Sequence, residues 1–254
     1  MGGHNVACYM NTGKREDQQD CIFLDGKIIQ ENMDAVTYAE MLPDSRVLLA
    51  VCDGMGGLRH GERASRFVCQ MLKKELAGMK SGRASVTTIL KRIQDEMERQ
   101  EMRNTGSTVA GIVMDNNKTM IFNAGDSRVY KIAGGGIVRL SHDHSLVQSA
   151  IDSGHISEWE SLHHPYRHVI TFGMGDVFSE LWSGNGRAYV REDILGQNEY
   201  YLICSDGLHD LLEDSEILEM LSPDPFDRLP EMISRIKDKM KDNLSLILAG
   251  SERN

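Results

Sequence analysis

Three aspartates, Asp53, Asp126 and Asp206, each follow a short apolar run and lie beside a glycine. The clearest case is the run Val47–Cys52, which leads directly into Asp53 and then Gly54-Met55-Gly56-Gly57. A carboxylate at the end of a buried strand is well placed to bind a metal ion, because a glycine turn lets backbone carbonyls approach the same ion. Three acids placed in this way predict one polynuclear metal site.

The available ligand types indicate which metals such a site would prefer. The five cysteines and nine histidines form no zinc-binding pattern, so His142, His144, His163 and His164 are interpreted as structural. Carboxylate oxygens without thiolates or converging histidines favour Mg²⁺ or Mn²⁺ over Zn²⁺. An aspartate next to glycine is by itself commonly a turn residue, so the prediction depends on the three acids occurring together.

The elements that must position these acids are mostly strands. Apolar runs rich in β-branched residues predict strands over Val6–Met10, Arg46–Cys52, Thr108–Met114, Thr119–Asn123, Arg128–Ala133, Glu199–Cys204 and Leu244–Leu248. The connections 115–118 and 134–136 are polar or glycine-rich, which is typical of antiparallel hairpins. We therefore expect neighbouring strands to form a meander.

Helical periodicity is clearest over 64–76, where apolar residues recur every three or four positions. Similar spacing predicts a helix over 86–97, with Ser81 or Ser85 as its N-cap, and another over 229–240. Because the first two helices are consecutive in the sequence, we expect them to cover one face of a sheet.

The central stretch 146–182 is less regular than the rest of the chain. It contains a short apolar face, a glycine stop at Gly154, and Ser157 and Glu160 at the spacing of a capping box. We interpret it as a flap-like excursion on the surface of one domain that spans residues 1–254, since no repeat or linker divides the chain.

Composition excludes several classes of protein. The chain has 254 residues, 41% hydrophobic content and a formal net charge of −10, which suffices for a large core and argues against a nucleic-acid partner. The scattered cysteines are expected to be reduced core residues of a cytoplasmic protein. No apolar run approaches the ~20 residues of a membrane span, so membrane insertion and export are not expected.

Further motifs connect the acids into one pattern, which resembles the metal-dependent protein phosphatase family (PPM, type 2C), in its bacterial form. The motifs follow the family's order along nearly the whole chain: R-x-x-Q-Q-D at Arg15–Asp20, V-C-D-G-M-G-G at Val51–Gly57, G-E at Gly61–Glu62, G-S-T at Gly106–Thr108, N-A-G-D-S-R at Asn123–Arg128, L-S-H-D-H-S at Leu140–Ser145, S-D-G-L-H-D at Ser205–Asp210 and D-N-L-S at Asp242–Ser245. Each motif alone is weak, whereas the ordered set is specific.

The resemblance implies a fold and an activity. The fold is an α+β, four-layer α/β/β/α sandwich of two mostly antiparallel sheets flanked by helices. The activity is hydrolysis of phosphoserine and phosphothreonine on proteins by a water that bridges two Mg²⁺ or Mn²⁺ ions, without a phosphoenzyme. The implied partners are phosphorylated proteins and a cognate Ser/Thr kinase.

The resemblance also assigns roles to individual residues. Asp53 bridges the two ions, the Gly54 carbonyl helps to hold one of them, and Asp206 and Asp242 hold the other. Asp20 orients bound water, and Arg15 grips two phosphate oxygens with its planar fork. Asp126, with Asp206 and Asp210, matches the positions that hold a weaker third metal in many members.

Two positions depart from the family pattern. Met55 stands where some relatives have a histidine proposed as general acid, so the leaving group must be protonated by metal-bound water or by another group. Gln18-Gln19 stands where relatives often have Asn or Glu before the aspartate, so a direct glutamate ligand is missing and water must replace it.

Two alternatives from other classes remain open at the level of sequence. A catalytically silent relative could use the same fold to bind a phosphorylated partner, although Arg15, Asp53, Asp206 and Asp242 are all present. An acidic scaffold for structural Ca²⁺ is less favoured, because the loop spacing of an EF-hand is absent.

Overall fold

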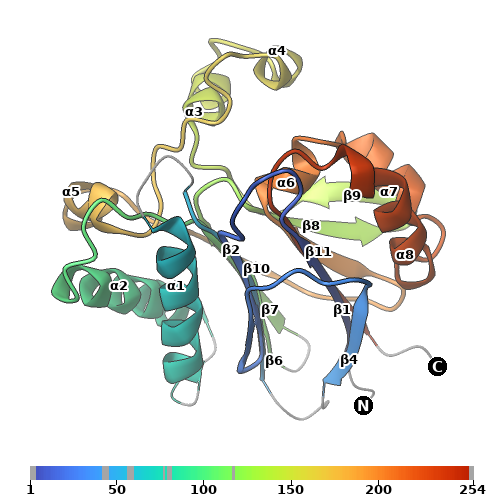
Figure 1. Cartoon of the computed structure of the whole chain (residues 1–254), viewed down its shortest axis with the longest axis horizontal. Helices are drawn as coiled ribbons and strands as arrows, with labels where there is room; N and C mark the ends of the chain where they lie inside the picture. The colour runs from blue at the N-terminus through green and yellow to red at the C-terminus, as the bar shows by residue number, and fades with distance from the viewer. Residues whose placement is uncertain are drawn as a thin grey trace.

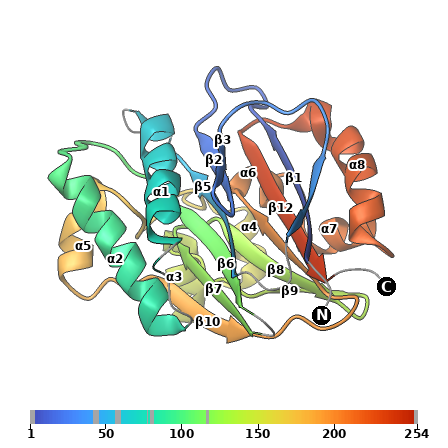
Figure 2. The same cartoon turned by 90° about the horizontal axis from the view of Figure 1, so that it is seen from below.

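Two antiparallel sheets lie face to face at the centre of the molecule, and helices cover the outer face of each (Figure 1). The computed structural model describes residues 4–41, 46–55, 60–76, 78, 82–115 and 118–251. A view from below shows the same succession of helices, sheet, sheet and helices (Figure 2). The expected four-layer α+β sandwich is therefore confirmed.

We call the two six-stranded sheets sheet A and sheet B. Sheet A has the order β4 (Thr37–Met41), β1 (His4–Asn11), β12 (Leu244–Ser251), β11 (Tyr200–Cys204), β8 (Arg128–Ala133) and β9 (Gly136–Arg139). Sheet B has the order β10 (Tyr189–Asp193), β7 (Lys118–Ala124), β6 (Val109–Asp115), β5 (Val47–Asp53), β2 (Asp20–Leu24) and β3 (Lys27–Ile29).

The helices divide between the two sheets. Helices α1 (Gly61–Leu76), α2 (Arg83–Arg99) and α5 (Ser179–Ser183), with the 3₁₀ turn η1 (Asp176–Phe178), lie on the side of sheet B (Figures 1 and 2). Helices α7 (Asp214–Leu221) and α8 (Pro225–Ile236), followed by η2 (Lys237–Lys239), lie on the side of sheet A. The short helix α6 (Asp206–His209) follows β11, and α3 (Leu146–Asp152) and α4 (Glu158–Leu162) stand away from both sheets.

Continuous apolar strands arise because each sheet is buried on both faces. In β5, Leu49 and Val51 pack against sheet A, whereas Leu48, Ala50 and Cys52 pack under α1 and α2. Sheet A likewise contributes Ile203 and Ile247 to the layer between the sheets. Burial of this kind contributes roughly 25 cal/mol per Å² of apolar surface and fixes the strand ends that carry the acids.

All seven predicted strands exist, with ends that differ by at most a few residues from the predicted ones. The short strands β2, β3, β4, β9 and β10 were not predicted, because they are short, lie at sheet edges or contain charges. The glycine hairpin after Ala133 is confirmed, whereas residues 116 and 117 of the other predicted hairpin lie outside the described residues. The expected meander holds for β5, β6 and β7 but stops there, since β8 belongs to the other sheet.

The predicted helices are confirmed, with two corrections. The N-cap of α2 is Gly82, which makes no side-chain capping bond; Ser85 lies inside the helix, and Ser81 lies outside the described residues. Helix α8 ends at Ile236 rather than continuing to Met240, because the chain there tightens into the 3₁₀ turn η2.

Connections that cross from one sheet to the other bring the acids to one edge of the sandwich. Residues 12–19 lead from β1 in sheet A to β2 in sheet B, and residues 125–127 lead from β7 in sheet B back to β8 in sheet A. Gly125 adopts φ +111°, and a Cβ there would lie 2.6 Å from the Thr108 side chain, so this crossing requires glycine.

The stretch 146–182 divides into two structurally different halves. Residues 146–169, which we call the projecting segment, form α3 and α4 and extend away from the sandwich (Figure 1). The capping box of Ser157 and Glu160 at the start of α4 is confirmed. The second half is not a surface excursion, because Phe172, Met174 and Trp182 are buried in the core on the α2 side of sheet B.

Candidate metal centre

Asp20 and Asp53 lie directly opposite each other on the antiparallel neighbours β2 and β5. Cross-strand partners project from the same face of a sheet, so the register places the two carboxylates side by side. Asp20 is fully buried, and Ser205 Oγ donates a hydrogen bond to its Oδ2 at 2.7 Å. Its other oxygen, Oδ1, has no hydrogen-bond partner among the described residues.

Sheet A delivers Asp206 and Asp242 to the same edge. Asp206 follows β11 as the first residue of α6, and Asp242 lies two residues before β12, the neighbour of β11. Ser205 fixes the two chain segments to each other, because its amide donates to the Ser245 carbonyl and its hydroxyl accepts from the Ser245 amide, both at 3.0 Å. The acids therefore come from both sheets.

The Arg15 side chain lies at this edge and contacts Asp242. Arg15 Nη2 donates to Asp242 Oδ2 at 2.5 Å, and its side chain remains 52% exposed. Asn243 holds the loop that carries Arg15: its Nδ2 donates to the carbonyls of Thr12 and Asp17, and its Oδ1 accepts from the Gln19 amide at 2.6 Å.

Gly54 allows the turn after Asp53 to pack closely against its surroundings. Its amide donates to the Gln19 carbonyl at 3.1 Å, and a Cβ at Gly54 would lie only 2.2 Å from the Gly61 carbonyl oxygen. Asp53 itself is fixed by Thr108, whose amide donates to the Asp53 carbonyl and whose hydroxyl accepts from the Asp53 amide. The G-S-T motif thus has a positioning role at Asp53.

The carboxylates have high proton affinity. Burial raises the pKa of Asp20 to about 6 and that of Asp126 to about 7, and it raises the pKa values of Asp53 and Asp206 well above the usual aspartate range. Repulsion between the acids adds to burial: Asp20 and Asp206 act on Asp53, and Asp126 acts on Asp206. The centre consequently favours a bound positive charge.

The donor set fits divalent cations. Two buried carboxylate oxygens, Asp20 Oδ1 and Asp126 Oδ1, have no hydrogen-bond partner among the described residues, and such groups are costly unless something satisfies them. Asp53, Asp206 and Asp242 offer only oxygen atoms as ligands, and hard cations such as Mg²⁺ and Mn²⁺ prefer oxygen. The unsatisfied negative charge of the site and the oxygen atoms of its acids therefore both suit a divalent cation such as Mg²⁺ or Mn²⁺.

A cleft of about 750 Å³ opens beside these residues. Its polar wall includes Arg15, Asp53, Gly54, Asp206 and Asp242, which sequence reasoning had assigned to one site. The cleft is also lined by His168 and by apolar residues, namely Met55, Ile170, Val177 and Phe178. Asp20 lies buried behind the cleft, next to Asp53.

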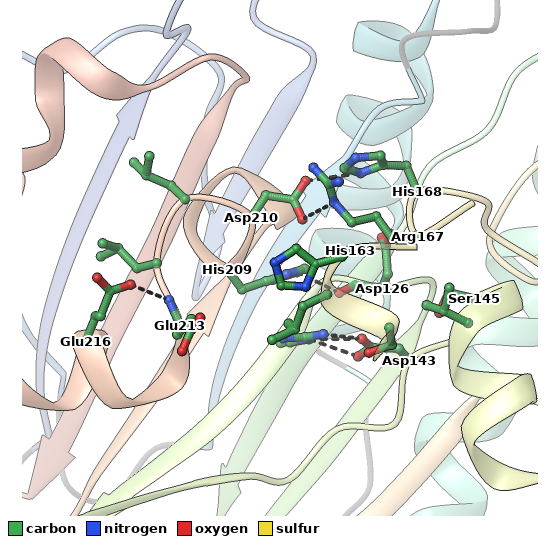
Figure 3. Close-up of a pocket in the computed structure, with 16 residues that line it drawn as sticks. Asp126, Asp143, Ser145, His163, Arg167, His168, His209, Asp210, Glu213 and Glu216 are labelled. Carbon is green, nitrogen blue, oxygen red and sulfur yellow. Dashed lines mark hydrogen bonds and ion pairs between the residues drawn. The ribbon is translucent and has the colours of Figure 1, made fainter. Parts of the chain in front are cut away.

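Asp126 and Asp210 lie in a neighbouring cavity of about 310 Å³ rather than in the main cleft (Figure 3). Asp126 is 6% exposed, and its carbonyl contacts His209 Nε2 at 3.1 Å. Asp210 faces the projecting segment, where His168 Nδ1 lies 3.1 Å from Asp210 Oδ2. Sequence reasoning missed His168, because the irregular stretch around it carries no motif.

Arg128 and Asp143, which also line the smaller cavity, form a buried ion pair. Arg128 Nη2 and Nε both donate to Asp143 Oδ2, at 2.7 and 2.9 Å. Among the surrounding charges, Arg128 makes the largest contribution to lowering the pKa of Asp143. Arg128 and Asp143 neutralise each other's charge, so we assign this ion pair a structural role beside Asp126.

The two departures from the family pattern have structural counterparts. Met55 packs partly buried against the core while lining the cleft, and its side chain has no proton to donate. Gln18 Oε1 accepts from the Asp20 amide at 3.1 Å, so this residue holds Asp20 in place. Gly56 and Gly57 of the same motif lie outside the described residues.

Of the histidines interpreted as structural, His144 is mostly buried. Its ring nitrogens contact the carbonyls of Gly125 and Arg187, at 3.3 and 3.1 Å. Burial lowers the pKa of His144, which keeps its ring neutral. The expectation that no histidine converges on the acids is wrong for His168, which contacts Asp210 and has a ring nitrogen within 4.8 Å of an Asp206 oxygen.

Comparison with known proteins identifies the family. The sequence profile described as Protein phosphatase 2C matches residues 30–249. The serine/threonine protein phosphatase PstP of Mycobacterium tuberculosis is 29% identical over 219 residues, which cover 80% of this chain and 40% of that protein. The chain thus spans less than half the length of this curated relative.

Solved structures agree with this result. The serine/threonine phosphatase Stp1 from Staphylococcus aureus is 27% identical, with a TM-score of 0.77 and coverage of 98% of this chain and 95% of that one. The catalytic domain of PstP, solved in complex with two manganese ions, has the same fold at 22% identity, with a TM-score of 0.75 and full coverage of both chains. Given the ordered motifs, the sandwich and the profile match over most of its length, the chain belongs to the protein phosphatase 2C family.

Proposed function

We propose that this protein is a metal-dependent phosphatase that removes phosphate from phosphoserine and phosphothreonine residues of other proteins. One observation carries the proposal: Asp53, Asp206 and Asp242, which are far apart in the sequence and come from two sheets, line one cleft with Arg15. Its family membership and the names of its relatives, PstP and Stp1, support the same activity.

Asp53, the Gly54 carbonyl, Asp206 and Asp242 would hold two divalent ions, either Mg²⁺ or Mn²⁺. The PstP structure with two manganese ions supports this number. When bound, such ions activate a water for in-line attack and stabilise charge on the phosphoryl group. Asp20, held by Ser205 and buried next to Asp53, would accept a proton or orient water from behind the cleft. A weaker third position would use Asp126, Asp206 and Asp210.

Arg15 would bind the substrate phosphate. In the structure its guanidinium contacts Asp242, half of its side chain is exposed, and it lines the cleft. A carboxylate that binds a cation is a weaker acceptor, which would free the planar fork for two phosphate oxygens. Met55 cannot supply the proton that the leaving group needs, so that proton would come from solvent or from another group in the cleft.

Residues 1–254 would form one phosphatase domain with a single metal centre, with the projecting segment as a flap beside the cleft. None of the helices in the described part of the chain has both the length and the apolar character that a bilayer crossing requires. Five buried free cysteines fit a reducing cytoplasm. Phosphorylated proteins would be its substrates, and a Ser/Thr kinase its opponent.

The test uses the purified chain with a phosphothreonine peptide and with p-nitrophenyl phosphate. Phosphate release should require Mn²⁺ or Mg²⁺, stop on addition of EDTA, and fall at least about 100-fold in Asp53→Asn. The matched control is Asp95→Asn, which removes an exposed carboxylate from α2 and should leave turnover unchanged. Normal Mn²⁺ binding without turnover of either substrate would refute the enzyme and favour the silent, partner-binding alternative.

A further inference from the structure

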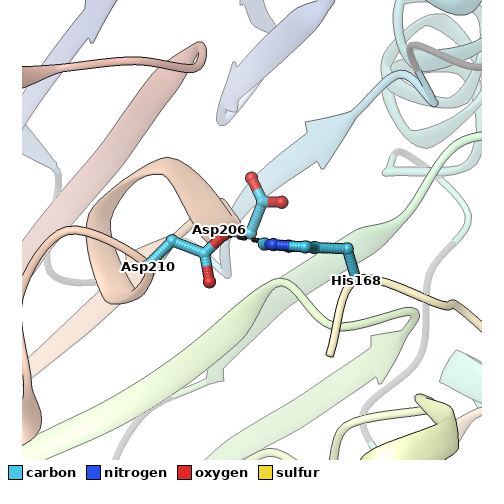
Figure 4. A group of neighbouring side chains, drawn as sticks. All are labelled: His168, Asp206 and Asp210. Atoms are coloured by element: carbon cyan, nitrogen blue, oxygen red, sulfur yellow. Dashed lines mark ion pairs between the residues drawn. The ribbon is translucent and has the colours of Figure 1, made fainter. Parts of the chain in front are cut away.

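The projecting segment returns to the sandwich at the edge where the acids gather, and its last residues contact them. His168 Nδ1 lies 3.1 Å from Asp210 Oδ2, and Arg167 Nε lies 4.0 Å from Asp210 Oδ1 (Figure 3). One ligand atom each of His168, Asp206 and Asp210 lies within 4.8 Å of the other two (Figure 4). These three side chains come from two separate parts of the chain.

Asp126 supplies an independent indication of a ligand at this place. It is 6% exposed, and its Oδ1 has no hydrogen-bond partner among the described residues. Asp126, His168 and Asp210 line the same cavity, so the unsatisfied carboxylate belongs to the same hollow as the histidine and Asp210. A cation bound between them would satisfy a buried oxygen that nothing else in the described structure satisfies.

We propose that His168 is a nitrogen ligand to a divalent cation held by Asp126, Asp206 and Asp210, and that this cation fixes the projecting segment in place. The inference rests on the metal-dependent function proposed above and adds a ligand from outside the motifs of the two-sheet centre. A mixed set of imidazole and carboxylates suits Mn²⁺ better than Mg²⁺, because Mg²⁺ prefers oxygen ligands alone.

The projecting segment is otherwise attached near its start, where Gln148 accepts a hydrogen bond from Arg139 and Asp152 contacts His142, so a cation at His168 would anchor its other end. Its two ends are joined by a hydrogen bond from the Leu146 amide to the Val169 carbonyl, at 2.9 Å. Between these ends, Trp159 is 72% exposed and Tyr166 is 57% exposed, so the segment buries little apolar surface. An element with few buried contacts opens at low free-energy cost, and one metal–ligand bond therefore changes its mobility measurably.

The experiment measures metal binding and segment mobility, not turnover. Mn²⁺ is titrated into the metal-free protein, free Mn²⁺ is followed by electron paramagnetic resonance, and amide hydrogen exchange over 146–169 is recorded with EDTA and with saturating Mn²⁺. The variant is His168→Ala, whose side chain is half-exposed and whose loss leaves the core intact. The matched control is His155→Ala, an exposed histidine of the same segment.

We expect the weakest Mn²⁺ site of His168→Ala to lose roughly tenfold or more in affinity while the tighter sites keep theirs. Mn²⁺ should slow exchange over 146–169 in the wild type and in His155→Ala, but not in His168→Ala. Equal affinities at every site in the three proteins would overturn the proposal. So would a loss of protection in His168→Ala that is the same in EDTA and in Mn²⁺, because this would assign the effect to the ion pair with Asp210 alone.

The outcomes separate this inference from the function on which it rests. If no Mn²⁺ binds to the wild type at any site, both fail. If two ions bind and the phosphopeptide is hydrolysed, but His168→Ala binds Mn²⁺ like the wild type, only the role of His168 fails.

Discussion

Replacing Asp20 by asparagine should make the metal-free protein more stable and the phosphatase less active. Asp20 is fully buried, and burial raises its pKa to about 6, compared with 3.8 for an ordinary aspartate. The folded carboxyl therefore holds its proton more tightly than the unfolded one, and stability is lost as the pH rises from about 4 to about 6. Above that range the full cost of the buried charge remains.

The size of the effect follows from these two pKa values. Their difference corresponds to about 3 kcal/mol at about pH 7.5, where Asp20 would be ionised in both states. In the variant, the amide oxygen can still accept from Ser205, but the NH₂ group takes the place of the unpaired Oδ1 and costs about 1 kcal/mol. The net gain is about 2 kcal/mol, or ~4–8 °C in melting temperature.

Urea unfolding in EDTA checks this value at two pH conditions. The gain of Asp20→Asn over the wild type should be about 2 kcal/mol at about pH 7.5 and near zero at about pH 4.5. At the lower pH the folded carboxyl is protonated, so ionisation of the unfolded carboxyl costs the wild type only about 1 kcal/mol, which the buried NH₂ group of the variant offsets. Asp95→Asn on the exposed face of α2 should show no comparable gain. Turnover with Mn²⁺ should fall roughly 10- to 100-fold in Asp20→Asn. A variant less stable than the wild type in EDTA, or a gain independent of pH, would refute the reasoning.

Three further predictions follow from the same centre. Gly54→Ala should abolish turnover and lower the melting temperature, because the added Cβ would lie 2.2 Å from the Gly61 carbonyl oxygen. Gly136→Ala is the control, since the nearest atom to its added Cβ is 3.6 Å away. Equal melting temperatures for the two variants would contradict the steric argument. Arg15→Ala should lower kcat/KM for a phosphothreonine peptide about 10- to 100-fold, because charge-assisted hydrogen bonds contribute about 1.5–3 kcal/mol. Arg15→Lys should have a kcat/KM between those of the wild type and Arg15→Ala. Unchanged kcat and KM in both variants would exclude a phosphate contact. Thermal melts in EDTA should show stability falling between about pH 4 and 7, because burial raises the pKa of Asp126 to about 7 and the folded state then releases its proton later than the unfolded state. Saturating Mn²⁺ should reverse the loss, and a rise in stability over this range would contradict the sign.

The elements predicted correctly from the sequence are those whose local residue pattern is typical of a single kind of secondary structure. The run Val47–Cys52 was predicted to be a buried strand followed by a glycine turn, and the structure confirms both. The helical spacing of Val86, Ile89 and Ile93 gave the buried face of α2 correctly. These features depend on local composition, which the sequence displays directly.

Features that depend on distant partners were not predictable in this way. Strand β2 was missed because its five residues follow a charged segment and its pairing with β5 is visible only in three dimensions. The switch of sheets at Gly125 was missed because the turn there reads like any hairpin connection. His168 was missed because no motif surrounds it, and only the path of the projecting segment brings it to Asp210.

The position of β12 in sheet A has a consequence for proteolysis. This strand lies between β1 and β11, and it pairs with β1 from His4 opposite Ser251 to Asn11 opposite Leu244. A protease cut that releases the chain from about residue 240 onward would remove an interior strand together with Asp242, leaving β1 and β11 each with one unpaired edge. We therefore expect a fragment that ends near residue 240 to lose both the continuity of sheet A and turnover.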